Sequence, residues 1–370
     1  MKRLISTYFF CLLFCAALSG QGLKGWTVEP NLYFGKILKH TPKLLFDTDH
    51  MSFGAEVNFL FQTHGRKEWN ELHRYPLLGL AFTYYRLGDP NILGTAYGLL
   101  PNINVPIYTR NKWKVYFQLG TGVAYLTKQF NELTNPTFNA IGSNINTIAN
   151  IEFMAGYRVN KAWTLSGGFT FTHYSNGGGH LPNFGLNIPA LSVGARYAPK
   201  PVSPKDFIHH GVSKKAVKKF GITANAALAF RERVVSGGPS YPVYIGSIGG
   251  LYYLNRVNRL IAGVEYEYNK GAYAFGTHVY EFNSEREAKW RSSRLMVYVA
   301  DEFLFGDWSL TLLVGTYAGD FYQVNFPIYN KLITRYYFPP VGKVRMHVGL
   351  YLKSHIVIAE YIGIGVGMAM

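Results

Sequence analysis

The stretch at residues 113–125, WKVYFQLGTGVAY, decides the fold because its residues alternate in character with a period of two. The odd-numbered positions are mostly apolar and hold Trp113, Val115, Phe117, Leu119, Thr121, Val123 and Tyr125. The positions between them hold Lys114, Tyr116, Gln118, Gly120, Gly122 and Ala124. Such alternation indicates a β-strand with one apolar face. Aromatic residues close both ends of that face, as is typical of strands that face lipid.

The same alternation recurs at 51–61, 308–315 and 346–353. Strands of a soluble β-sandwich average about five or six residues, whereas a tilted strand that crosses a bilayer needs about 9–11. Because several of these runs reach that length, we predict an all-β fold, a transmembrane antiparallel β-barrel. Candidate strands lie near 24–36, 50–61, 76–87, 91–107, 113–126, 149–159, 162–175, 189–198, 219–231, 242–254, 257–268, 272–283, 292–305, 307–318, 343–353 and 355–368.

The segment at 199–218 interrupts this pattern, since it is rich in Pro and Lys and has no period of two. It is interpreted as a linker or a long loop. About eight candidate strands precede it and about eight follow. The periodicity leaves two arrangements open, two eight-stranded barrels or one wide barrel of about sixteen strands. We predict a first barrel unit at 21–198 and a second strand unit, of unknown role, at 219–370.

The N-terminus has the layout of a cleaved secretory signal. Two basic residues precede an apolar run at 4–18, and small residues follow at 19–20. We therefore predict export, with a signal peptide at residues 1–20. Cys11 and Cys15 are the only cysteines and lie within the apolar run, so no disulfide or thiol chemistry is expected in the exported chain. The bulky Phe14 argues against a lipid anchor on Cys15.

The formal net charge of +16 has two open interpretations. One is a surface that faces anionic lipid headgroups in a membrane. The other is a solvated basic surface without a ligand. Nucleic acid is a poor candidate partner for an exported chain, and the sequence does not indicate an oligomeric state.

A histidine and a serine stand where the candidate strand at 162–175 meets a glycine-rich turn, in the sequence HYSNGGGHLPNFGLN at 173–187. Residues two apart on a strand point the same way. His173 and Ser175 share their parity with Phe169 and Phe171, so we expect both on the apolar, lipid-facing side. An unpartnered polar group in hydrocarbon costs several kcal/mol. This pair therefore needs an explanation.

Two explanations compete. In the first, the strand has reached the headgroup region by His173, and the glycines only form a turn. In the second, the hydroxyl and imidazole form an activated nucleophile, and the glycine-rich backbone directs N–H groups at an oxyanion. Such a site would receive its substrate directly from the bilayer.

The motif HYSNGGGHLPNFG resembles the His-x-Ser-Asn-x-Gly…Pro-Asn-x-Gly signature of outer-membrane lipid A deacylases of the acyloxyacyl hydrolase type. The resemblance covers at most 24–198 and is sharpest at 173–187. It implies an eight-stranded barrel with its site on the outer wall. It also implies Ser175 as nucleophile, His173 as general base, and the backbone N–H groups of Asn176 and Gly178 as the oxyanion site.

Asn187 departs from the family, in which a glutamate at this position orients the histidine. No Asp or Glu occurs between Glu152 and Asp206 to replace it. An amide whose oxygen faces the imidazole can still fix its tautomer, as in Cys-His-Asn enzymes. Asn187 is thus either a working orienter or a turn residue, and reduced or absent activity is an open outcome.

Other residues are weaker candidates for a functional site. The glycines at 177–179 lack the Lys-Ser/Thr that follows in a phosphate-binding loop. His180 is either an assisting group or a solvated loop residue. His209 and His210 lack spaced partners for a metal, and no cofactor is expected. The sequence therefore predicts an outer-membrane esterase that removes an acyl chain from lipid A or a related outer-leaflet lipid. The alternative is a non-catalytic barrel, either a porin-like channel or a structural protein.

Overall fold

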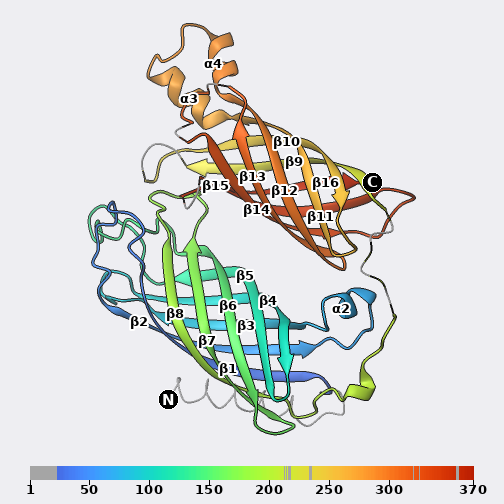
Figure 1. Cartoon of the computed structure of the whole chain (residues 1–370). Coiled ribbons are helices and arrows are strands. Elements are labelled where there is room, and N and C mark those ends of the chain that lie inside the picture. Colours follow the sequence, from blue (N-terminus) through green and yellow to red (C-terminus); the bar gives the residue numbers. More distant parts are fainter. Residues whose placement is uncertain are drawn as a thin grey trace.

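Two closed antiparallel β-barrels of eight strands each make up the described part of the chain (Figure 1). The computed structural model describes residues 23–370 except 212, 214, 216–217, 233–235, 320, 325 and 356–357. The predicted signal peptide at 1–20, with Cys11 and Cys15, lies outside the described residues. The predicted barrel fold is confirmed, and the arrangement is the pair of narrow barrels rather than one wide barrel.

Each barrel is a meander in which neighbouring strands are consecutive in sequence, and its last strand pairs with its first. The first barrel comprises β1 (Trp26–Lys36), β2 (Met51–Gln62), β3 (Leu77–Arg86), β4 (Thr95–Arg110), β5 (Trp113–Leu126), β6 (Ile145–Arg158), β7 (Trp163–Ser175) and β8 (Leu186–Tyr197). The second comprises β9 (Phe220–Glu232), β10 (Ser240–Tyr253), β11 (Asn258–Asn269), β12 (Ser293–Phe305), β13 (Trp308–Tyr317), β14 (Ile328–Tyr337), β15 (Arg345–His355) and β16 (Ile358–Ala369).

Short helices lie in the connections. They are α2 (Glu68–Leu72), the 3-10 turn η1 (Pro204–Asp206), α3 (Lys270–His278) and α4 (Glu285–Arg291). None of the helices in the described ranges is long and apolar enough to cross a membrane.

The alternation in sequence separates an outer wall from a filled interior. On β5, Tyr116 and Gln118 point inward and are buried, whereas Val123 and Tyr125 point outward and are exposed. An eight-stranded barrel leaves an interior just wide enough for side chains. The period of two therefore places most of the large apolar residues of β5 on the outer wall.

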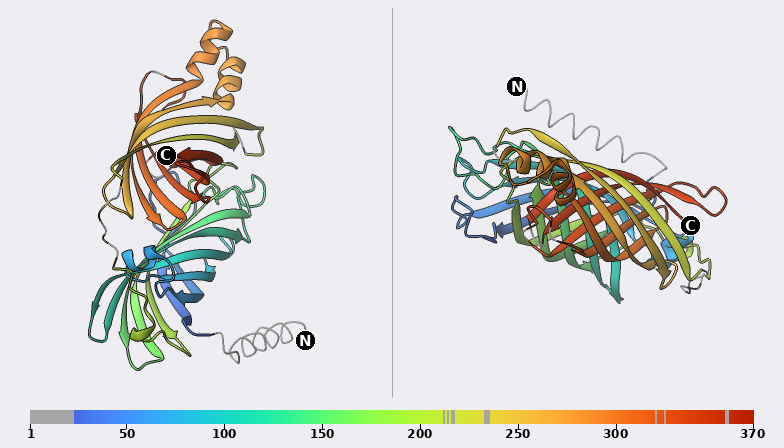
Figure 2. Two further views of the ribbon diagram at one scale, coloured as in Figure 1. Left: turned by 90° about the vertical axis from the view of Figure 1, so that its right-hand side faces the viewer. Right: turned by 90° about the horizontal axis from the view of Figure 1, so that it is seen from above.

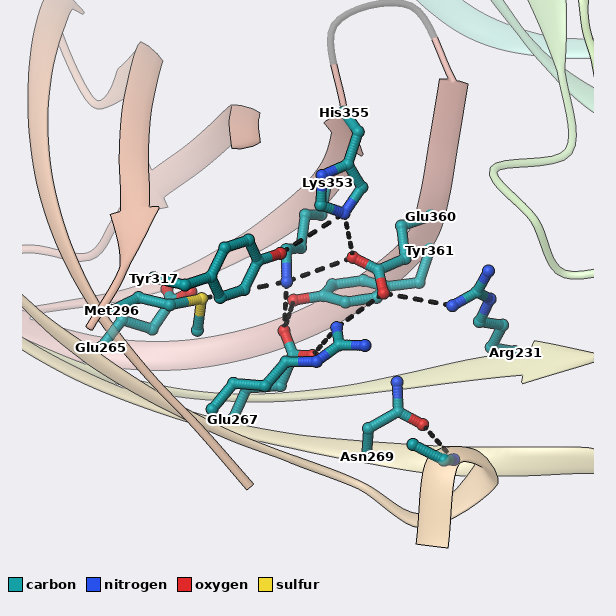
Figure 3. Close-up of polar contacts among 12 residues, drawn as sticks. Arg231, Glu265, Glu267, Asn269, Met296, Tyr317, Lys353, His355, Glu360 and Tyr361 are labelled. Carbon is teal, nitrogen blue, oxygen red and sulfur yellow. Dashed lines mark hydrogen bonds and ion pairs between the residues drawn. The ribbon is translucent and has the colours of Figure 1, made fainter. Parts of the chain in front are cut away.

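Paired charges occupy the interior of the second barrel (Figure 3). Glu267 accepts hydrogen bonds of 2.7 Å from Arg294, from Lys353 and from Tyr361. Glu302 accepts from Arg259 at 2.6 Å in a neighbouring group of contacts. Buried charges are expensive unless they are paired and hydrogen-bonded. These contacts meet that requirement and fill the interior with side chains.

One predicted strand was wrong and one observed strand was missed. The predicted strand at 272–283 overlaps helix α3, which begins after Asn269, whose side chain accepts a hydrogen bond from the Ala272 amide. An N-cap of this kind favours a helix start. Strand β14 was missed because Lys331 and Arg335 point into the barrel, so its inner and outer faces differ little in polarity. Ion pairs with Glu265 and Glu302 balance these two cations.

The two barrels lie side by side and contact each other near both ends (Figures 1 and 2). At the end that carries α2, Lys67 forms an ion pair of 3.0 Å with Asp307 of the β12–β13 turn. The imidazole of His73 stacks on Phe305, with ring centroids 4.6 Å apart. The Asp307 turn lies outside the strands, and its hydrogen bond with Lys67 lowers the pKa of Asp307. At the opposite end, the β7–β8 loop meets β9 and β16.

Because the first barrel closes on itself, a fragment that ends near Ala198 should fold alone in detergent or lipid. A closed barrel has no unpaired strand edge in hydrocarbon, and β1 pairs with β8 rather than with any strand beyond residue 198. Heat-modifiable gel mobility and circular dichroism would measure this. An aggregated fragment, under conditions in which the full chain folds, would contradict separate folding units.

Candidate active site

His173 and Asn187 are direct partners across β7 and β8 on the outer wall of the first barrel. On β7, Thr170, Thr172 and Tyr174 are buried in the interior, so the opposite parity of His173 places it outward. Asn187 has the same parity as Leu191, which is exposed. Directly opposed strand residues have neighbouring side chains. The register therefore brings the predicted base and the predicted orienter together.

A chain of hydrogen bonds fixes the His173 ring. Its Nδ1 lies 2.6 Å from Oδ1 of Asn187, and Nδ2 of Asn187 lies 3.1 Å from Nδ1 of His40. The other ring nitrogen of His40 lies 3.0 Å from the carbonyl oxygen of Phe184. An amide nitrogen only donates, so this arrangement has Asn187 donating to His40 and accepting from His173. The Nε2 atom of His173 is then the unprotonated nitrogen.

Ser175 is held by the loop that follows it. Its Oγ donates to Oδ1 of Asn183 at 3.2 Å and accepts from the Gly177 amide and from Nδ2 of Asn183, both at 3.0 Å. The residue is only 2% exposed. Among the described residues, no hydrogen bond joins Ser175 to His173. The two predicted partners lie on one wall of β7, but the hydroxyl hydrogen points to Asn183.

Both predicted oxyanion donors are occupied by amide oxygens of the protein. The Asn176 N–H donates to Oδ1 of Asn183 at 3.1 Å, and the Gly178 N–H donates to Oδ1 of Asn176 at 3.0 Å. These two side-chain oxygens take the place that a substrate oxygen would need. Both N–H groups are therefore already hydrogen-bonded within the protein.

Glycines let the loop fold tightly against the base. Gly185 has φ of 77°, and a Cβ atom there would lie 2.8 Å from Cε1 of His173. Gly177 and Gly178 also have positive φ, at 66° and 79°. Glycine is the residue that adopts such a conformation without strain. Gly185 thus lets the loop backbone approach the ring of His173 closely.

This geometry can be compared with known proteins. The family model for lipid A 3-O-deacylase (PagL) matches residues 53–196, and the model for the C-terminal domain of acyloxyacyl hydrolase matches 210–370. The first barrel is thus similar to the lipid A 3-O-deacylase (PagL) family, as its motif predicted. The deacylase match falls on the first barrel, which carries His173, Ser175 and Asn187. The C-terminal match includes the whole second barrel.

Solved structures that the chain matches include Neisserial surface protein A, at 12% identity and a TM-score of 0.34, covering 47% of this chain and 97% of that chain. They also include the outer membrane enzyme PagL, at 15% identity and a TM-score of 0.33, covering 45% of this chain and 97% of that one. No curated protein matches the chain.

The other histidines lie in different surroundings. Nδ1 of His180 lies 3.7 Å from Oε1 of Glu232, which belongs to the second barrel. His209 and His210 lie beside the β2–β3 connection, where His209 contacts the Tyr75 hydroxyl at 2.8 Å and His210 the Gly65 carbonyl at 2.7 Å. The described residues contain no group of three or more His, Cys, Asp or Glu that could hold a metal ion.

Sequence reasoning missed three residues at this site. Asn183 stood within the quoted motif, where its fixed spacing after Ser175 was the available signal. His40 lies 147 positions from Asn187 and Glu232 lies 51 positions from Leu181. Such distant residues carry no local pattern, and only the folded chain brings them to the site.

Proposed function

We propose that this protein is an outer-membrane esterase that removes an acyl chain from lipid A or a related outer-leaflet lipid. The matches of the two barrels to the lipid A 3-O-deacylase (PagL) model and to the acyloxyacyl hydrolase C-terminal model support a lipid A substrate and hydrolase activity. The observation that carries the proposal is the contact of 2.6 Å between His173 and Asn187, beside Ser175 on the outer wall. A base whose tautomer is fixed, next to a hydroxyl, is the arrangement that nucleophilic catalysis requires.

In the proposed reaction, Ser175 attacks the carbonyl carbon of the acyl ester. His173 takes the hydroxyl proton on Nε2, and Asn187 holds the ring by accepting from Nδ1. The imidazolium then gives its proton to the leaving alcohol oxygen, which leaves an acyl-Ser175 ester. Water, activated by the same imidazole, hydrolyses that ester and releases the fatty acid.

Three hydrogen bonds must change partners for this reaction. The Ser175 hydroxyl has to turn from Asn183 toward His173, and a substrate oxygen has to displace the amide oxygens that now occupy the Asn176 and Gly178 N–H groups. Catalytic hydrogen bonds often form only in the substrate complex. The proposed oxyanion site is therefore preformed in backbone position and exchanges a side-chain acceptor for the substrate oxygen.

The outer wall supplies an apolar surface for the acyl chain. Phe169 and Leu191 are cross-strand partners that point outward and are exposed at 46% and 66%. Because side chains alternate along a strand, Phe169 lies on the same face as His173 and Leu191 on the same face as Asn187, closer to the middle of the barrel wall. A lipid could therefore present its ester to Ser175 with its acyl chain against the barrel. The paired charges that fill the second barrel do not favour the alternative of a porin-like channel.

Mass spectrometry of lipid A from cells with and without the protein tests this proposal. Expression should produce lipid A that lacks the mass of one fatty acyl chain, because hydrolysis adds water and releases the acid. Cells that express Ser175→Ala should keep the unmodified lipid A. Identical lipid A spectra with and without the folded wild-type protein would contradict the proposed substrate.

A further inference from the structure

A carboxylate, Glu232, lies on the outer wall of the second barrel, at the end that contacts the β7–β8 loop of the first barrel. Glu232 shares its parity on β9 with Leu228 and Phe230, which are outward and exposed. Glu232 itself is only 4% exposed. A buried carboxylate on an otherwise apolar wall is costly unless it is hydrogen-bonded. Its partners therefore indicate why it is there.

The partners of Glu232 belong to the loop that closes over Ser175. Its Oε2 accepts a hydrogen bond from the backbone N–H of Leu181. Its Oε1 lies 3.7 Å from Nδ1 of His180, whose side chain is 64% exposed. The second barrel thus provides a charged acceptor to the β7–β8 connection of the first.

Strand β16 packs on the same loop. A Cβ atom on Gly177 would lie 2.2 Å from Cγ1 of Ile362, and one on Gly178 would lie 2.5 Å from the carbonyl oxygen of Glu360. Ile362 pairs with Phe230 on the outer wall, next to Glu232. Two glycines of the motif are therefore required where the second barrel touches the loop.

Contacts inside the second barrel hold this surface in place. The register between β15 and β16 shifts at Glu360, so both Glu360 and Tyr361 are buried. Carboxylate oxygens of Glu360 lie 3.1 Å from Arg231, 3.2 Å from Lys353 and 3.0 Å from His355 (Figure 3). The backbone that faces Gly178 is thus anchored by ion pairs.

The residues that Glu232 contacts are close in sequence to those that hydrogen-bond Ser175. Leu181 lies two residues before Asn183, whose side chain contacts both the Ser175 hydroxyl and the Asn176 N–H. The carbonyl oxygen of His180 accepts from Nδ2 of Asn176 at 2.9 Å. Fixing the Leu181 amide therefore limits where Asn176 and Asn183 can lie.

We infer that Glu232 is a positioning residue supplied by the second barrel. It holds the β7–β8 loop of the first barrel, which carries the proposed oxyanion donors, in a fixed position relative to Ser175. The inference rests on the proposed function. It gives the second barrel a role in hydrolysis without any contact to the reacting atoms. A misplacement of about 1 Å at a reacting group can cost about 100-fold in rate. Loss of this contact should therefore lower kcat.

Three variants of the full chain test the inference with lipid A in mixed micelles. Glu232→Ala should lower kcat by about 10- to 100-fold with little change in KM, because the loss concerns orientation in the transition state. Glu232→Gln keeps an oxygen that can accept from Leu181, so its kcat should stay close to that of wild type. Asp307→Ala removes a contact between the barrels at the other end. It should also leave kcat close to wild type.

Hydrogen exchange of the Leu181 amide provides a second readout that does not depend on activity. Exchange should be faster in Glu232→Ala than in wild type and stay slow in Glu232→Gln. If the wild type is active and Glu232→Ala has the same kcat, the inference about Glu232 is overturned while the proposed function stands. A wild type that releases no fatty acid would overturn the proposed function. Unchanged exchange in Glu232→Ala would then show that the contact does not hold the loop either.

Discussion

Ser175→Ala and His173→Ala should each reduce the release of fatty acid from lipid A by about 10³-fold or more. The two groups act as one unit in the proposed mechanism, so either deletion removes the activated nucleophile. Both barrels should still fold, because a buried partner of Ser175 left without its hydrogen bond costs only about 1–3 kcal/mol, and the strand pairing of both barrels is unchanged. Initial rates on purified protein in mixed micelles, with circular dichroism of each variant, measure both quantities.

Ser166→Ala is a matched control on the same strand. Ser166 donates to Glu29 at 3.1 Å on the interior side of β7, away from the proposed site. The Ser166→Ala variant should release fatty acid at the same rate as wild type. Full activity in Ser175→Ala would contradict the nucleophile assignment. Unfolding of Ser175→Ala would instead favour the interpretation of the motif as a structural turn.

The barrel could be predicted from sequence because the two environments of its strands differ strongly. On β5 and β13 most outward residues are apolar and most inward ones are small or polar, so the period of two is visible. The two faces of β14 do not differ in this way, because Lys331 and Arg335 lie inside the barrel and form ion pairs with glutamates from other strands. The pairing that stabilises such a strand lies outside any local window of sequence.

The number of barrels was not decided by periodicity, because closure depends on which strands pair. The pairing of β1 with β8 and of β9 with β16 closes two rings. A wide barrel would need the same alternating strands, with β8 paired to β9 and β16 paired to β1. The composition at 199–218 indicated a linker but left both arrangements open.

The candidate site could be predicted only where it is local. His173, Ser175 and Asn187 share a motif and one hairpin, and the register places His173 opposite Asn187. The contact of Asn187 with His40 depends on the β1–β2 loop. The contact of Leu181 with Glu232 depends on the position of a second barrel. Neither can be read from the spacing of residues in the motif.

Asn187 is where this chain differs most from the motif it resembles, and its substitution should produce a large effect. Asn187→Leu has nearly the same size but no acceptor for Nδ1 of His173, and it leaves Nδ1 of His40 without its donor. The imidazole can then rotate or adopt the wrong tautomer, so the rate should fall by about 10²- to 10⁴-fold. Asn187→Glu restores a carboxylate acceptor and should preserve or raise the rate, because it stabilises the imidazolium that forms as Ser175 attacks.

Initial rates on lipid A in mixed micelles, from pH 6 to 9, would measure both Asn187 variants against wild type. His40→Gln is an informative companion, since it tests the outer link of the hydrogen-bond chain while Asn187 stays in place. If Asn187 orients His173, His40→Gln should lower the rate less than Asn187→Leu does, because the direct acceptor remains at 2.6 Å. Wild-type activity in Asn187→Leu would mean that the amide is only a turn residue. The ring of His173 would then be oriented by its packing against Gly185, where a Cβ atom would come within 2.8 Å of it.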